Sequence, residues 1–130
     1  MVDAERGGDS LADVIDDGDD VAVAAITVAE LKVGVQLAKG SRRDKRERFV
    51  AAILDAVSIE PYELDVAEAH AALLAHVRRT GTPRGAHDLI IAATARARER
   101  QVVSSDQAGF TGLPEVSIAS GSHKDRRGAR

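Results

Sequence analysis

Apolar residues recur along the chain in short runs that alternate with longer stretches of helical spacing. The short runs predict strands at residues 21–25, 57–60, 101–104 and 116–118. The longer stretches predict helices over residues 10–17, 27–38, 41–56, 65–80 and 86–100. Such alternation is typical of an α/β fold in which helices cover both faces of a parallel sheet.

The chain is predicted to form one domain followed by a short tail. Its 130 residues, 44% of them hydrophobic, are enough to bury one core but not two. We assign residues 1–118 to this domain. Residues 119–130 are rich in Gly, Ser and charged side chains and are expected to be disordered, because they have nothing to bury.

Composition excludes several classes of site. The absence of cysteine rules out disulfides, thiolate zinc sites and a cysteine nucleophile. Aromatic residues make up 2% of the chain, so base stacking is not expected to drive nucleic-acid binding. No apolar run approaches the roughly 18 residues that span a bilayer, and the first residues do not resemble a signal peptide. We therefore expect a cytoplasmic protein without a membrane partner.

The charge of the chain is unevenly distributed. A net charge of -3 argues against a protein that coats nucleic acid through bulk electrostatics. One segment is nevertheless basic, with cations at Arg42, Arg43, Lys45, Arg46 and Arg48. A local basic surface is compatible with this pattern.

Three acidic residues follow or begin predicted elements in a way that suggests a common site. Glu30 follows the strand at 21–25, Asp88 lies in the first turn of the helix at 86–100, and Asp106 follows the strand at 101–104. Ligands of parallel sheets sit beyond the carboxyl ends of the strands, so these acids are expected to converge. Carboxylate oxygens are the ligands that Mg²⁺ and Mn²⁺ prefer. The arrangement indicates a divalent-metal site.

Each of these acids also has a purely structural interpretation. Residues 27–30 match a capping box, in which Glu30 would bond back to the start of its helix. Asp88 fits an acid favoured by the helix dipole, and Asp106 fits a turn residue that bonds its own backbone. His87 is interpreted as a structural or supporting side chain rather than a metal ligand. Each structural reading is at least as good for one acid alone, and only the set favours a metal site.

Three segments, in this order and spacing, resemble the PIN-domain toxins of the VapC family. They are Ala25-Ile26-Thr27-Val28-Ala29-Glu30-Leu31 with Gly34-Val35, the segment 85–95 around His87-Asp88, and Val102-Val103-Ser104-Ser105-Asp106. The resemblance covers about residues 10–118 and implies a PIN-like three-layer α/β/α fold with a short parallel sheet. It also implies a ribonuclease toxin that uses Mg²⁺ or Mn²⁺ to cut RNA, forms a homodimer and is inhibited by a cognate VapB-like antitoxin. By the same resemblance, Glu30, Asp88 and Asp106 are the catalytic and metal-binding acids, and Ser104 and Thr27 support them.

The N-terminus departs from the family pattern. VapC-like chains begin with an apolar strand that ends in an Asp ligand, whereas this sequence begins at Met1-Val2-Asp3-Ala4-Glu5-Arg6, which resembles the segment after that strand. Only two residues precede Asp3, too few for an ordinary strand. We therefore expect a PIN-like domain whose N-terminal strand is missing, through either a late start or true shortening. Two functions follow: the ribonuclease toxin, and a catalytically inactive PIN module that binds an antitoxin or a partner subunit.

Overall fold

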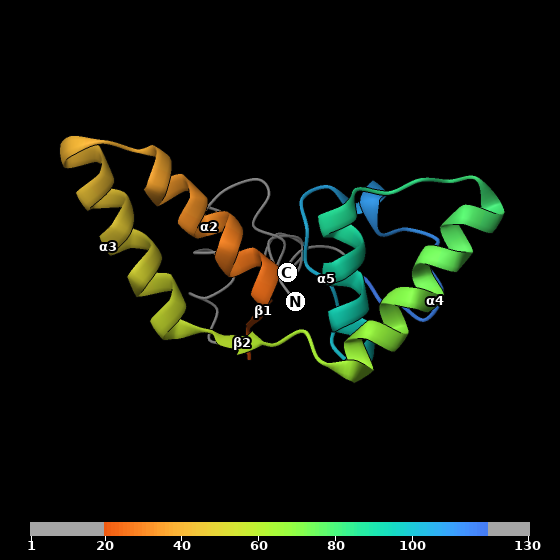
Figure 1. Cartoon of the computed structure of the whole chain (residues 1–130). Coiled ribbons are helices and arrows are strands. Elements are labelled where there is room, and N and C mark those ends of the chain that lie inside the picture. Colours follow the sequence, from red (N-terminus) through yellow and green to blue (C-terminus); the bar gives the residue numbers. More distant parts are fainter. Residues whose placement is uncertain (1–19, 120–130) are drawn as a thin grey trace, which may run out of the picture.

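The structure, a computed structural model, describes residues 20–119 (Figure 1). In chain order its elements are β1 (Ala22–Ala24), α2 (Ala25–Leu37), α3 (Gly40–Ala56), β2 (Ser58–Glu60), α4 (Leu64–Thr80), α5 (Ala86–Ala97) and the 3-10 helix η1 (Gln107–Gly109). The helix predicted at 10–17, the question of the N-terminal strand and the tail from residue 120 onward lie outside the described residues.

The short sheet separates two groups of helices. β1 and β2 run parallel, with Val23 opposite Ile59. Successive side chains of a strand point to opposite faces, so Ala22 and Ala24 belong to one core and Val23 to another. The first core joins the alanines to α4 and α5, and the second joins Val23 to Ile53 of α3. This layered arrangement, seen in Figure 1 with α2 and α3 on one side and α4 and α5 on the other, confirms the predicted α/β fold.

Pairing beyond β1 and β2 is less extensive than predicted. In the segments predicted as strands at 101–104 and 116–118, Val102 and Ile118 form a parallel bridge, and Val103 is also a bridge residue. The hydrogen bonds of the bridge between Val102 and Ile118 join Val102 N to Ser117 O at 2.8 Å and Ala119 N to Val102 O at 2.9 Å. The chain passes through positive φ at Gly112 and Glu115, and these turns leave only its last residues alongside Val102. Among residues 20–119, neither segment forms a continuous strand.

Helix ends follow the prediction where glycine marks them and deviate where it does not. α4 ends at Gly81, whose φ of 67° is the left-handed geometry that glycine adopts easily. α5 ends at Ala97 rather than at residue 100, because Glu99 takes the left-handed conformation with φ 56°. A Glu at such a position carries no sequence signal. Within residues 20–119, no helix has both the length and the apolar character needed to cross a bilayer.

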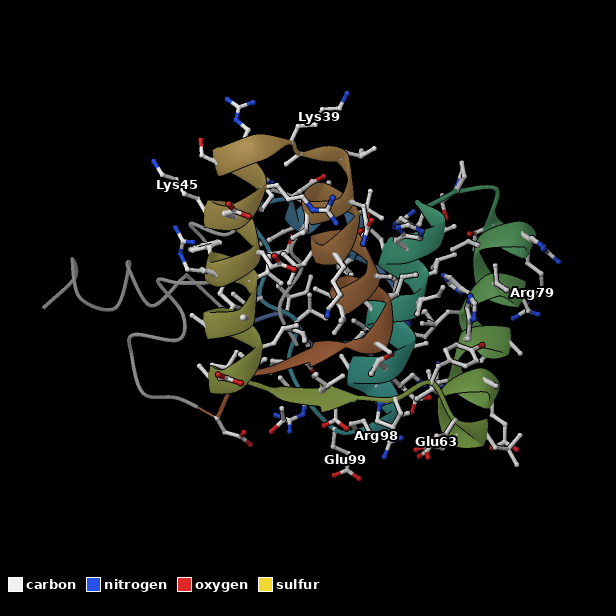
Figure 2. The ribbon with its side chains drawn as sticks, turned by 60° about the vertical axis from the view of Figure 1, so that its left-hand side comes forward. Lys39, Lys45, Glu63, Arg79, Arg98 and Glu99 are labelled. Atoms are coloured by element: carbon white, nitrogen blue, oxygen red, sulfur yellow. The ribbon has the colours of Figure 1, made fainter. Side chains whose placement is uncertain are left out.

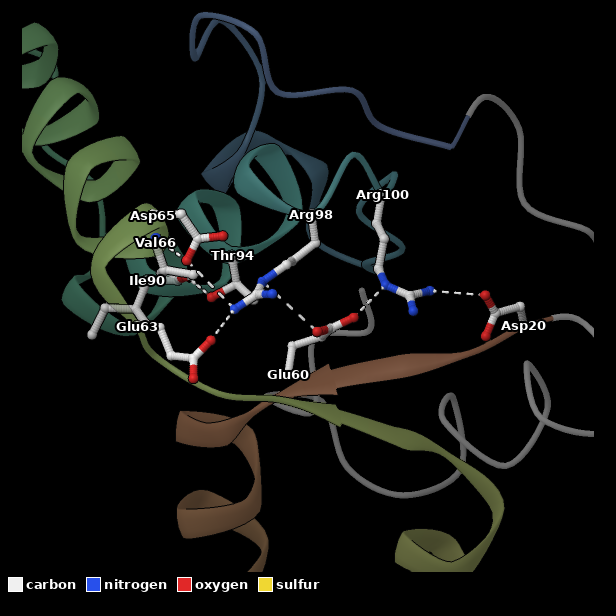
Figure 3. A network of polar contacts seen from close by, with 9 residues as sticks. All are labelled: Asp20, Glu60, Glu63, Asp65, Val66, Ile90, Thr94, Arg98 and Arg100. Carbon is white, nitrogen blue, oxygen red and sulfur yellow. Dashed lines mark hydrogen bonds and ion pairs between the residues drawn. The ribbon is translucent and has the colours of Figure 1, made fainter.

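Arg98 and Arg100 tie the segment after α5 to β2 and α4 (Figure 3). Arg100 Nε donates to Glu60 Oε2 at 2.9 Å, and Arg98 donates to Glu63 Oε1 at 3.0 Å. The hydrogen bond with Glu63 raises the pKa of Arg98 above its usual value. Glu63 and Arg98 lie together at one end of the molecule in Figure 2. This network fixes the C-terminal end of α5. Asp88, one of the predicted site acids, lies near the N-terminal end of the same helix.

Candidate functional site

Glu30 and His87 meet where α2 contacts α5. α2 follows β1 without an intervening loop, which places Glu30 in its second turn, and His87 lies in the first turn of α5. Glu30 Oε2 and His87 Nδ1 are 2.5 Å apart, and the contact is an ion pair when the imidazole is protonated. The side chain of Glu30 is 27% exposed and that of His87 is 54% exposed. His87 therefore supports the carboxylate of Glu30 from its solvent side.

The capping-box interpretation of Thr27 and Glu30 is wrong. α2 begins at Ala25, and its N-cap residue Ala24 makes no side-chain capping bond. Thr27 lies inside the helix, fully buried, and its Oγ1 has no hydrogen-bond partner among the described residues. Since Glu30 points to His87 rather than to the start of α2, its carboxylate serves a contact between helices.

Asp88 lines the same pocket as Glu30. The pocket has a volume of about 310 Å³ and is lined by Glu30, Gly85, Ala86, His87 and Asp88. Asp88 is in the first turn of α5, as predicted. Its Oδ2 lies 3.5 Å from where a Cβ on Gly85 would be and 2.7 Å from where one on Gly109 would be. The carboxylate of Asp88 is thus held in a narrow gap between two glycines.

Asp106 reaches this region through its own turn. Its backbone N donates to Ser104 Oγ at 3.0 Å, and Ser104 Oγ donates to the backbone O of Asp106 at 3.2 Å. Ser104 therefore holds the backbone of Asp106. η1 starts immediately after Asp106 and ends at Gly109, which lies against the carboxylate of Asp88. The turn that carries Asp106 is consequently in contact with the pocket acid Asp88.

Two buried oxygens test whether the residues suit a cation. Glu30 Oε1 and Thr27 Oγ1 are buried and have no hydrogen-bond partner in the described part of the chain. A buried carboxylate oxygen without a donor is unfavourable unless a cation or a water neutralises it, so Glu30 Oε1 suits a metal. In residues 20–119, however, no group of three His, Cys, Asp or Glu side chains is close enough to hold a metal. The structure joins Glu30 and Asp88 in one pocket and brings the Asp106 turn to its edge without uniting all three carboxylates.

Gly109 is a site residue that the sequence interpretation misses. Its φ is not positive, so it is not a glycine required by backbone geometry. Its role comes from proximity, because any side chain there would meet Oδ2 of Asp88. The following residue, Phe110, is 1% exposed and anchors the turn in the core. In the sequence, the available signal was a glycine followed by an aromatic residue, and this pair is too common to identify a site.

The chain is similar to known toxins in sequence and structure. A family model described as PIN domain matches residues 1–115. Toxin FitB of Neisseria gonorrhoeae is 34% identical over 96 residues, which are 71% of this chain and 69% of that protein. The VapC ribonuclease Y4jK of Sinorhizobium fredii is 35% identical over 92 residues, 68% of this chain and 66% of that protein. The solved structures that are similar include VapBC-5 from Mycobacterium tuberculosis, a member of the VapBC family of toxin-antitoxin systems. The match covers 75% of this chain and 79% of that chain, with a TM-score of 0.66 and 33% sequence identity.

Proposed function

This chain belongs to the PIN-domain family of VapC-type toxins, and we propose that it is a divalent-metal-dependent ribonuclease that acts as the toxin of a toxin–antitoxin pair. The observation that carries the proposal is the shared pocket of Glu30 and Asp88. These acids come from different helices, and Glu30 Oε1 is buried there without a hydrogen-bond donor from residues 20–119. An acidic pocket of this kind favours a cation.

In the proposed site, Glu30, Asp88 and Asp106 would hold Mg²⁺ or Mn²⁺. When bound, such an ion lowers the pKa of a water and neutralises charge on the leaving oxygen of a phosphodiester. His87 fixes the orientation of the Glu30 carboxylate through its hydrogen bond, and Ser104 fixes the backbone of Asp106. Thr27 contributes a buried hydroxyl below Glu30 on the same helix. No histidine is needed as a general base.

The proposed partners follow from the relatives. The similar structures include complexes described as VapBC, which supports a VapB-like antitoxin as the partner of this chain. A partner needs apolar surface, and Val33 and Leu37 provide it on one stripe of α2, with 52% and 76% of their surfaces exposed. A homodimer and an RNA substrate complete the proposal.

The experiment is cleavage of a labelled single-stranded RNA by the purified chain, with Mg²⁺ or Mn²⁺ titrated against EDTA. Asp88→Asn should lower the cleavage rate by more than about 100-fold. Substituting a residue that only supports a metal ligand lowers activity by about 10- to 100-fold, so a larger loss indicates that Asp88 binds the metal itself. Glu68→Gln is the control, because Glu68 is an exposed acid of α4 that lies outside the pocket. Equal cleavage by the wild-type and Asp88→Asn proteins would falsify the proposed site.

One observation favours the second candidate, a catalytically inactive PIN module that binds an antitoxin or a partner subunit. Within the described residues, the three acids do not form a complete ligand set. This candidate predicts that the wild-type chain cleaves no RNA at any metal concentration and still binds its antitoxin. The same titration, followed by a binding assay with the antitoxin, separates the two functions.

A further inference from the structure

The first half of α3 forms a strongly basic surface in an acidic protein. Residues 39–48 contain six cations and two acids, whereas the whole chain has a net charge of -3. We call this set the α3 basic face; its cations are Lys39, Arg42, Arg43, Lys45, Arg46 and Arg48. All six residues are exposed. Figure 2 shows Lys39 and Lys45 projecting from the tip and outer side of the α2–α3 hairpin.

In the described part of the molecule, the side chains of these cations form no hydrogen bond or ion pair, unlike those of Arg84, Arg98 and Arg100. Arg84 donates to Thr111 O at 2.7 Å, Arg98 to Glu63 and Arg100 to Glu60. Those side chains connect loops and helices. Between residues 20 and 119, no ion pair joins a cation of the α3 basic face to an acid. Six neighbouring cations without an ion pair among residues 20–119 repel one another, so a polyanion that binds there relieves an unfavourable field.

Arg46 is the cation of this face that lies over α2, the helix that carries the pocket acid Glu30. Its Nη1 lies 3.0 Å, and its Cδ 3.4 Å, from the position that a Cβ of Gly34 would occupy. Gly34 therefore leaves room for the side chain of Arg46 to lie flat on α2. Glu30 is four residues before Gly34 on the same helix, and residues at this spacing are neighbours about 5–6 Å apart. The guanidinium is held about one helical turn from a pocket acid without forming an ion pair with it.

We propose that the α3 basic face, entered through Arg46, binds the phosphate backbone of single-stranded RNA and leads it toward the pocket of Glu30 and Asp88. The inference rests on the proposed ribonuclease function. The row of cations on α3 can bind successive phosphates of a polyanion. The carboxylates of Glu30 and Asp88 can bind a metal ion, which the phosphate to be cleaved would then approach. Arg46 suits the position nearest the pocket because its planar guanidinium can bind two oxygens of one phosphate.

An acidic protein segment is the competing ligand for this face. The exposed Val33 and Leu37 on α2 give a protein partner apolar contacts on the same hairpin. The α3 basic face, however, extends over α2 through Arg46 to within about one helical turn of the pocket acid Glu30, and an RNA substrate has to reach that pocket. The observations therefore favour RNA, and the protein ligand is an outcome of the test.

The experiment measures binding of a labelled single-stranded RNA in EDTA, where no metal-dependent cleavage occurs, over a range of salt concentrations. Each lost phosphate contact on a single strand makes the plot of log affinity against log salt shallower by about 0.7, which is about fivefold in affinity at about 0.1 M salt. Arg46→Gln should show this change. Gly34→Leu should weaken binding to a similar degree without altering net charge, because its side chain displaces Arg46.

The matched control is the double variant Arg78→Gln, Arg79→Gln. It removes two exposed arginines at the C-terminal end of α4, and Arg79 lies on the far side of the molecule from Lys45 in Figure 2. This variant should change affinity by less than Arg46→Gln despite the larger loss of charge. In cleavage assays, Arg46→Gln should raise KM and leave kcat unchanged. Circular dichroism of each variant checks that the fold is retained.

The outcomes separate this inference from the proposed function. If the chain binds RNA through the α3 basic face but Mg²⁺ and Mn²⁺ support no cleavage, the inference stands and the ribonuclease proposal fails. If the chain cleaves RNA while Arg46→Gln and Gly34→Leu bind it as well as the wild type, the inference is overturned and the ribonuclease proposal stands. If Arg46→Gln and Gly34→Leu weaken the binding of an acidic antitoxin segment and leave RNA binding intact, the α3 basic face binds a protein and the inference is also overturned.

Discussion

Replacing Gly109 with Ala tests whether the position of the Asp88 carboxylate matters. A Cβ at residue 109 would lie 2.7 Å from Oδ2 of Asp88, about 0.7 Å less than the 3.4 Å at which ordinary contact begins. The φ of Gly109 is not in the positive region, so the backbone accepts alanine. The Asp88 side chain must move instead, because it is the softer of the two groups.

Stability and activity should respond differently to this change. Alanine reduces the freedom of the unfolded chain and so contributes about 0.4–1 kcal/mol in favour of folding, which offsets the displacement of one carboxylate. The free energy of unfolding should therefore change by less than about 1 kcal/mol. A misplacement of about 1 Å in a reacting site lowers the rate by about 100-fold, so a shift of about 0.7 Å should lower kcat by roughly 10- to 100-fold.

Two measurements check this prediction: RNA cleavage in Mg²⁺ or Mn²⁺, and Mn²⁺ binding followed by calorimetry. Gly85→Ala is the matched control, because its Cβ would meet the same Oδ2 at 3.5 Å, an ordinary contact. The control should keep its activity and change the free energy of unfolding by less than about 1 kcal/mol, since Gly85 is the N-cap of α5 and the poorer capping by alanine is offset by the reduced freedom of the unfolded chain. If Gly109→Ala cleaves RNA and binds Mn²⁺ as the wild type does, the argument about Asp88 is refuted.

Two further predictions concern stability. Leu73 of α4 is 0% exposed, so Leu73→Ala should lower the free energy of unfolding in urea by about 2–5 kcal/mol. Leu64 is 75% exposed on the same helix, so Leu64→Ala should change this free energy by less than about 0.5 kcal/mol. Similar losses for the two variants would contradict the assignment of Leu73 to the core. Burial lowers the pKa of His70 below its usual 6.5. As the pH falls, residue 70 therefore gains its proton in the unfolded chain before it does so in the folded chain. The free energy of unfolding should consequently decrease as the pH drops below about 6.5. His70→Gln should reduce the difference between urea midpoints at about pH 7.5 and about pH 5.5, and an unchanged difference would contradict this assignment.

Much of the fold could be predicted because it depends on local periodicity. The spacing of Val66, Ala69, Leu73 and Val77 by itself places one buried stripe on α4, and Gly81 ends that helix. The prediction fails where a common residue takes an uncommon conformation, as Glu99 does at the end of α5. It also fails where turns limit a pairing, as they do before Ile118.

The order and spacing of three motifs in the sequence were sufficient to identify the family and to nominate Glu30, Asp88 and Asp106. Only the tertiary structure decided which atoms meet. It pairs Glu30 with His87 across 57 residues, places Gly109 against Asp88, and lays Arg46 over Gly34. The physical reason is that periodicity reflects the geometry of one helix or strand, whereas these distances depend on how separate helices pack against a shared core.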